Sequence, residues 1–240
     1  MTRKAAFFDL DGTLLVKPSS ELRFLKYLYH QDYIRFEQIA SGLLFYPAWV
    51  WRFGRDVGRK NKAFYHGLQA AKMEALATQW IDEYFHRLID GEIVAQVELC
   101  RQEKYHLVLL TGAPEFLARP IAQQLRMDHV IATRLATHNG RFTAAPPLCH
   151  PLGIDKRQLA HSWCEERRVD LADCAAYGDS HQDSYLLQAV DKAVAVNPDR
   201  RLERLAANQR WLVLNTRQRQ SQKGGPSSER KQPAPVVRTD

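Results

Sequence analysis

The feature that most constrains this chain is a short apolar run near its start that ends in two aspartates spaced by one residue. Residues 5–8, Ala-Ala-Phe-Phe, lead directly into Asp9-Leu10-Asp11-Gly12-Thr13. A continuous apolar run without alternation is typical of a strand buried on both faces of a parallel sheet. The run therefore predicts an α/β fold with Asp9 and Asp11 at the carboxyl end of a strand, where open parallel sheets bind their ligands.

The chemistry of this turn indicates a metal and phosphate site. Two close carboxylates repel each other unless a cation lies between them or one of them holds a proton. Oxygen ligands of this kind suit Mg²⁺, which takes one or two carboxylates together with a phosphate. Gly12 allows the sharp turn, and Thr13 adds a hydroxyl and an N–H to the same concavity. The alternative is an Asx turn that only ends the strand.

The rest of the chain alternates strands with helices, which predicts a doubly wound parallel sheet. Asn139-Gly140 is a typical turn for a β-hairpin, which we expect over residues 134–143. Further strands are expected at 106–110, 130–132, 174–177, 192–196 and 211–214, and helices at 92–103, 115–125, 155–167, 182–190 and 200–208.

Residues 17–86 interrupt this alternation with a mostly helical segment. Its first helix begins near Glu21, after a capping Ser19 or Ser20. We expect them to form a helical cap inserted into an α/β core of residues 1–16 and 87–216. Residues 217–240 are rich in Gln, Ser, Pro and charge, and we expect a disordered tail. The tail has six basic and two acidic residues, so it carries four of the chain's seven net positive charges. The basic charge is therefore weak support for a nucleic-acid partner, and we expect none.

One stretch of the helical segment, residues 39–53, is unusually apolar and aromatic, and basic residues follow it. It has two interpretations. It is either a helical hairpin that packs its aromatic side chains internally, or an apolar lip with a basic rim suited to a lipid-like phosphate or a membrane surface.

Two later strand ends and one helix start carry polar residues that suit the same site. Thr111-Gly112 offers neutral donors at the start of a helix, a natural seat for phosphate. Asp179 ends a later strand, and Asp183 lies one turn into the next helix. Lys156 stands at a helix start, where the helix dipole does not favour a lysine, so it is a candidate counter-charge for a phosphate.

Together these four segments resemble the motifs of the haloacid dehalogenase (HAD) superfamily. Asp9-Leu10-Asp11-Gly12-Thr13 resembles its first motif, Thr111-Gly112 its second, Lys156 its third and Gly178-Asp179-Ser180-His181-Gln182-Asp183 its fourth. A helical insertion between the first two motifs is similar to subclass IB, the phosphoserine-phosphatase-like members.

The resemblance implies a magnesium-dependent phosphomonoesterase that works through an aspartyl-phosphate. Asp9 would be the nucleophile and Asp11 the proton carrier. Mg²⁺ would be held by Asp9, the Asp11 carbonyl and Asp179. Thr111, Gly112 and Lys156 would bind the phosphoryl oxygens. Supporting roles fall to Gly12, Thr13 and Ser180, and to Asp183, which would orient Lys156 or a metal-bound water.

The implied substrate is a small phosphomonoester similar to phosphoserine or histidinol phosphate. Phosphoserine phosphatases use a cap glutamate and arginine, but Glu21 lies later than that pattern and cannot be carried over. A lipid-phosphate phosphatase similar to the phosphatidylglycerophosphatases, a HAD phosphotransferase and a non-catalytic HAD-like scaffold are the alternatives. Membrane-surface contact and oligomeric state stay open.

The four cysteines form no C-x-x-C pair and no leader is visible, so we expect a soluble cytoplasmic protein with reduced thiols.

Overall fold

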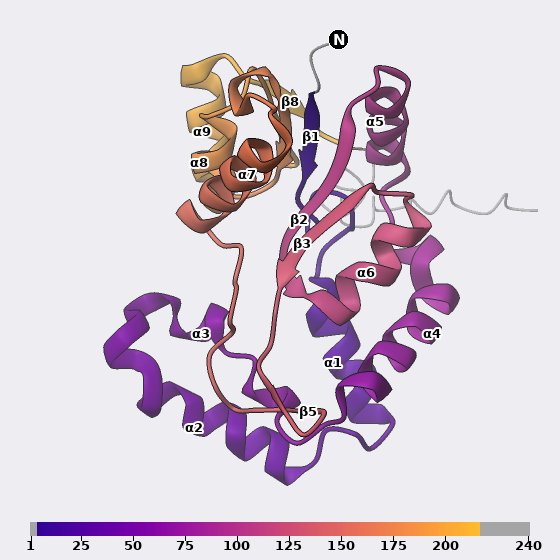
Figure 1. The fold of residues 1–240 in the computed structure, drawn as a ribbon, viewed down its shortest axis with the longest axis vertical. Helices are drawn as coiled ribbons and strands as arrows, with labels where there is room; N and C mark the ends of the chain where they lie inside the picture. Colours follow the sequence, from indigo (N-terminus) through magenta and orange to yellow (C-terminus); the bar gives the residue numbers. More distant parts are fainter. Residues whose placement is uncertain (1–3, 217–240) are drawn as a thin grey trace, which may run out of the picture.

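A central parallel sheet organises the structure, a computed structural model that describes residues 4–216. The predicted basic tail lies outside the described residues. Within them, the largest sheet has six strands in the order β3-β2-β1-β6-β7-β8, all parallel (Figure 1). The strands are β1 (Ala5–Phe8), β2 (His106–Pro114), β3 (His129–Thr133), β6 (Ala175–Gly178), β7 (Lys192–Val196) and β8 (Leu212–Leu214). The predicted doubly wound α/β fold is confirmed.

The opening strand supplies both faces of the sheet with core residues. Ala6 and Phe8 face one apolar cluster, and Ala5 and Phe7 face the other. Phe8 stacks on Tyr177 of the neighbouring strand with ring centroids 4.4 Å apart. The first cluster includes residues of α5 (Gly91–Gln102) and α6 (Glu115–Gln124), and the second includes residues of α7 (Ile154–Arg167), α8 (Ser184–Leu187) and α9 (Arg200–Gln209). Burial of both faces explains why this strand has no polar alternation.

A helical segment lies between β1 and β2 and covers the carboxyl end of β1 (Figure 1). It contains α1 (Ser20–His30), α2 (Phe36–Phe53), α3 (Val57–Lys60) and α4 (Ala70–Leu88). Ser19 caps α1, because its hydroxyl accepts a hydrogen bond from the Leu22 N–H at 3.3 Å. This is one of the two serines that the sequence offers as the cap.

The hairpin of β4 (Thr137–His138) and β5 (Arg141–Phe142) ties the helical segment to the sheet domain. Phe142 donates its N–H to the Leu68 carbonyl at 3.0 Å and accepts from the Gly67 N–H at 2.9 Å. The Phe142 ring lies among the rings of Tyr65 and Phe116. The hairpin therefore fixes how the helical segment sits over the site.

Most predicted bounds lie within a residue of the observed ones, but two elements differ more. Strand β2 continues through Thr111 to Pro114, because Pro114 pairs with Thr133 of β3 after a register shift. The helix expected over 182–190 is only α8, which ends at Leu187 and follows a 3-10 turn at residues 181–183. The Asp183 carboxylate accepts from the Ser180 N–H and caps this tight turn.

Candidate active site

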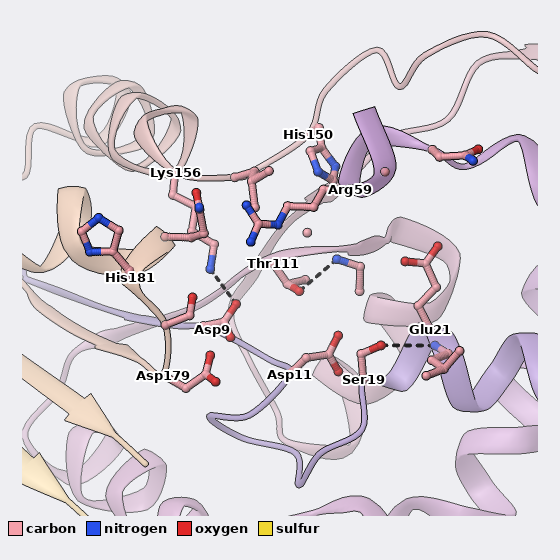
Figure 2. A pocket seen from close by; sticks show the side chains of 18 of the residues that line it. Asp9, Asp11, Ser19, Glu21, Arg59, Thr111, His150, Lys156, Asp179 and His181 are labelled. Atoms are coloured by element: carbon pink, nitrogen blue, oxygen red, sulfur yellow. Dashed lines mark hydrogen bonds and ion pairs between the residues drawn. The ribbon is translucent and has the colours of Figure 1, made fainter. Parts of the chain in front are cut away.

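Most of the predicted site residues meet at one cavity of about 870 Å³, where three adjacent strands end and α7 begins. Asp9 follows β1, Thr111 and Gly112 lie in β2, and Asp179 follows β6. Figure 2 shows these side chains converging from the sheet, with Lys156 opposite Asp9. The residues that line the cavity include Asp9, Asp11, Thr111, Gly112, Lys156, Asp179 and Ser180, whereas Gly12, Thr13 and Asp183 are not part of its wall.

Lys156 lies between two carboxylates. Its Nζ is 2.6 Å from Oδ1 of Asp9 and 2.5 Å from Oδ1 of Asp183. Burial by itself would lower the pKa of Lys156, but the two carboxylates outweigh it and raise that pKa. The second Asp183 oxygen accepts from the N–H and the hydroxyl of Ser180, at 3.1 and 3.0 Å. Asp183 is therefore fully hydrogen-bonded and holds the ammonium group of Lys156 toward Asp9.

Asp179 lies near Asp9 and Asp183 and is held by contacts of its own. Its Oδ2 forms an ion pair with Lys17 at 2.7 Å. Gly12 adopts φ +95°, and a Cβ there would lie 2.3 Å from the same oxygen. Only glycine allows both this left-handed conformation and the close approach of the Asp179 carboxylate.

The carboxylates form a compact oxygen cluster that fits a hard divalent cation. One oxygen each from Asp9, Asp179 and Asp183 lie within 4.8 Å of one another. Burial, together with the neighbouring carboxylates, raises the pKa of Asp9 to about 8 and that of Asp179 to about 6. Both shifts disfavour the charged carboxylates, and a bound cation would offset them. An oxygen-only donor set is the chemistry that Mg²⁺ prefers.

Asp11 points away from this cluster toward the helical segment. Its Oδ1 accepts from the backbone N–H of Ser20 at 2.6 Å, at the start of α1. Burial raises the pKa of Asp11, although the hydrogen bond from Ser20 opposes this shift. The Thr13 hydroxyl lies 3.5 Å from Oδ2 of Asp9. The two aspartates thus occupy different environments, despite being two residues apart.

Thr111 and Gly112 form the wall beside β1. Thr111 is buried, and its hydroxyl accepts from the Ala113 N–H at 3.1 Å. That contact leaves the proton of the Thr111 hydroxyl available to donate into the cavity. A Cβ on Gly112 would lie 3.5 Å from the Pro151 carbonyl oxygen, so the loop before α7 passes close to this backbone.

His150 in that loop was not singled out from the sequence, where a lone histidine gives no signal. The Thr133 hydroxyl donates to the Gly112 carbonyl at 2.7 Å, so its oxygen accepts from Nδ1 of His150 at 2.8 Å. This arrangement leaves the lone pair on Nε2. Burial lowers the pKa of His150 to about 3, and nearby lysines, first of all Lys62, act in the same direction. The ring is therefore neutral.

The helical segment adds charged residues to the cavity wall that sequence reasoning did not assign. Lys62 and Glu21 form an ion pair in which both side chains are largely shielded from solvent. Arg59 and Asn61 line the same cavity (Figure 2, where Glu21 and Arg59 are labelled). Glu21 and Lys62 are 41 residues apart. Only tertiary packing brings this pair together.

Comparisons with known proteins agree with the fold. Residues 6–188 match the family of haloacid dehalogenase-like hydrolases. "Probable phosphatase Rv3661" of Mycobacterium tuberculosis is 29% identical over 224 residues, covering 89% of this chain and 75% of its own length. "Phosphoserine phosphatase SerB1" of the same organism is 32% identical over 224 residues, covering 89% of this chain and 71% of its own length. A crystal structure from Bordetella pertussis Tohama I, of unknown function, aligns with a TM-score of 0.65 at 22% identity, over 89% of this chain and 99% of that one.

The chain belongs to the haloacid dehalogenase-like hydrolases. It is a phosphoric monoester hydrolase of that family. The resemblance seen in its sequence motifs is confirmed.

Proposed function

We propose that the protein is a magnesium-dependent phosphomonoesterase in which Asp9 attacks phosphorus to form an aspartyl-phosphate. The observation that carries this proposal is the placement of Asp9 on the cavity floor, between the ammonium group of Lys156 and the carboxylate of Asp179. A carboxylate held in this way, with a fixed positive charge beside it, suits nucleophilic attack on a phosphate.

The other residues divide the remaining work. Lys156, the Thr111 hydroxyl and the Gly112 N–H bind the phosphoryl oxygens of the substrate. Asp11 protonates the leaving oxygen and then takes a proton from the attacking water. Asp183 and Ser180 position Lys156.

Asp9, Asp179 and the backbone carbonyl of Asp11 would hold the magnesium ion. When bound, the ion supplies positive charge that reduces repulsion between the Asp9 carboxylate and the phosphate. Gly12 and Thr13 shape the turn that presents these groups.

We propose further that residues 17–86 form a cap that selects the substrate, over a core of residues 1–16 and 87–216. Glu21, Lys62 and Arg59 offer charges of both signs above the catalytic floor. This mixture suits a small zwitterionic phosphate, similar to phosphoserine or histidinol phosphate. The name of the relative SerB1 supports the first of these.

A substrate panel tests the proposal. Purified protein with Mg²⁺ is assayed for phosphate release from p-nitrophenyl phosphate, phosphoserine, histidinol phosphate and phosphatidylglycerophosphate. We expect release from p-nitrophenyl phosphate and from one of the two amino-group phosphates, and none from Asp9→Asn. Equal release by Asp9→Asn and the unaltered protein would contradict the proposed nucleophile.

The substitution Glu21→Gln tests the cap separately. Losing one charged contact to the substrate costs about 1.5–3 kcal/mol, so kcat/KM for the zwitterionic substrate should fall at least about tenfold. Release from p-nitrophenyl phosphate, which has no ammonium group, should change little. Preferred hydrolysis of the lipid phosphate would instead favour the lipid-phosphate alternative.

A further inference from the structure

The outward face of α2 is a largely exposed apolar stripe. Phe36, Leu43, Leu44 and Trp51 are 83%, 63%, 67% and 77% exposed. At about 100° per residue, the exposed apolar side chains fall within one sector of about 160°. We call this set the α2 stripe, and its members are Phe36, Ile39, Leu43, Leu44, Tyr46, Val50 and Trp51.

The opposite face of α2 already anchors the helix. Gln38, Gly42 and Phe45 are buried there. The Asn61 side chain donates to the Gly42 carbonyl at 2.8 Å, and a Cβ on Gly42 would collide with the ring of Phe64. Because this face holds the helix in place, most of the α2 stripe is left exposed, although the Tyr46 hydroxyl lies close to Gly58 of α3. A contiguous exposed apolar surface of this kind marks an interaction site.

The charge around the α2 stripe is positive on balance, although Arg59, Lys60 and Lys62 each form an ion pair. Helix α2 has no charged residue within the stripe, because Glu37 and Arg52 fall outside the sector that the stripe occupies. Residues 35–62 contain six basic and two acidic residues. Arg52 and Arg55 follow directly after the stripe, whereas Arg59 pairs with Asp56 and lines the catalytic cavity. Figure 1 shows α2 and α3 together at the outer edge of the molecule, away from the sheet.

We propose that the α2 stripe docks on the surface of an anionic phospholipid membrane. An amphipathic helix with Trp, Phe and Leu on one face and arginines beside it is suited to lie in the plane of the interface. No helix within residues 4–216 is long and apolar enough to cross a membrane. The positive charge favours anionic lipid over a second copy of this chain, because two copies of a basic segment repel each other.

Docking by α2 is a property separate from catalysis. The helix leads through residues 54–56 into α3, where Gly58 and Arg59 line the catalytic cavity. The α2 stripe itself contributes no residue to that cavity. Substitutions in the stripe should therefore alter membrane binding and leave hydrolysis of a soluble substrate unchanged.

Vesicle co-sedimentation of the full chain tests the proposal. Vesicles of phosphatidylcholine alone are compared with vesicles that also contain phosphatidylglycerol, at low and at high salt. We expect binding to the anionic vesicles that weakens with salt. The double variant Leu43→Gln/Trp51→Gln should bind about tenfold more weakly or worse. Leu99→Gln, at an exposed apolar position on α5, is the matched control and should bind like the unaltered protein.

Hydrolysis of p-nitrophenyl phosphate by each variant shows that it is folded, and light scattering gives its oligomeric state. The proposal is overturned if the unaltered protein ignores anionic vesicles. It is equally overturned if the double variant binds them as well as the control does. A dimer that becomes a monomer in the double variant, without vesicle binding, would assign the stripe to a second copy of the chain instead.

Discussion

Replacing Asp183 with asparagine keeps the size of this side chain but cannot preserve its contacts. One carboxylate oxygen of Asp183 accepts from the Lys156 ammonium group, and the other accepts from the Ser180 N–H and hydroxyl. Both sides of the carboxylate therefore face donors. An asparagine has one oxygen and one NH₂ group, so its NH₂ must meet a donor on one side.

The expected loss of stability follows from the burial of this pair. Asp183 and Lys156 are each about 95% shielded from solvent at the side chain. Removing one partner of a buried ion pair costs about 3–5 kcal/mol. Lys156 keeps its contact with Asp9, and loss of the Asp183 charge relieves its repulsion of Asp9 and Asp179, so we expect the lower end, about 3 kcal/mol of unfolding free energy. For a chain of this size that corresponds to a fall in Tm of about 6–12 °C.

Thermal and urea unfolding in the presence of a chelator measure the effect without a contribution from metal binding. The matched control is Asp170→Asn, since Asp170 caps an exposed turn through a single contact to the Ala172 N–H at 2.9 Å. Asparagine caps about as well as aspartate, so the control should change stability by less than about 0.5 kcal/mol. A value for Asp183→Asn that matches the control would refute the reasoning.

Two further changes probe the turn and the buried histidine. Gly12→Ala should lower stability by at least about 1 kcal/mol and raise the Mg²⁺ concentration for half-maximal hydrolysis. The reason is that the new Cβ would meet the Asp179 carboxylate, at a residue whose φ is positive. Unfolding curves and Mg²⁺ titrations that match those of the unaltered protein would contradict this. His150 has a pKa lowered from 6.5 to about 3, so the unfolded chain takes up its proton first as pH falls, and stability present above about pH 6.5 is lost toward pH 3. His150→Asn should therefore make the unfolding free energy less pH-dependent between pH 6.5 and 4.5, by up to about 1.4 kcal/mol per pH unit. His161→Asn, at an exposed position, is the control, and equal pH slopes for the two variants would argue against a buried neutral ring.

The core could be predicted from the sequence because its signals are local. Strands buried on both faces leave continuous apolar runs, and parallel topology places every carboxyl end at one edge of the sheet. These two facts suffice to bring Asp9, Thr111 and Asp179 together. The ion pair of Lys156 with Asp9 joins residues 147 positions apart, and the family motifs indicated that they share a site.

The helical segment resisted prediction because its helices pack by tertiary contacts. Nothing local shows that Lys62 meets Glu21, or that Lys17 meets Asp179. The apolar composition of residues 39–53 also leaves open which face is buried. In the structure Phe45 packs inward while Trp51 points outward, so the expected internal packing holds for one face of the helix only.

The most direct test of the account is to trap the phosphorylated enzyme with Asp11→Asn. p-Nitrophenolate leaves without protonation, so the variant should still transfer a phosphoryl group to Asp9, while hydrolysis stalls because Asp11 no longer activates water. Mass spectrometry of the quenched reaction should then show one phosphoryl group on the peptide that contains Asp9. Turnover of Asp11→Asn at the rate of the unaltered protein, or a phosphoryl group on any other residue, would contradict the proposed mechanism.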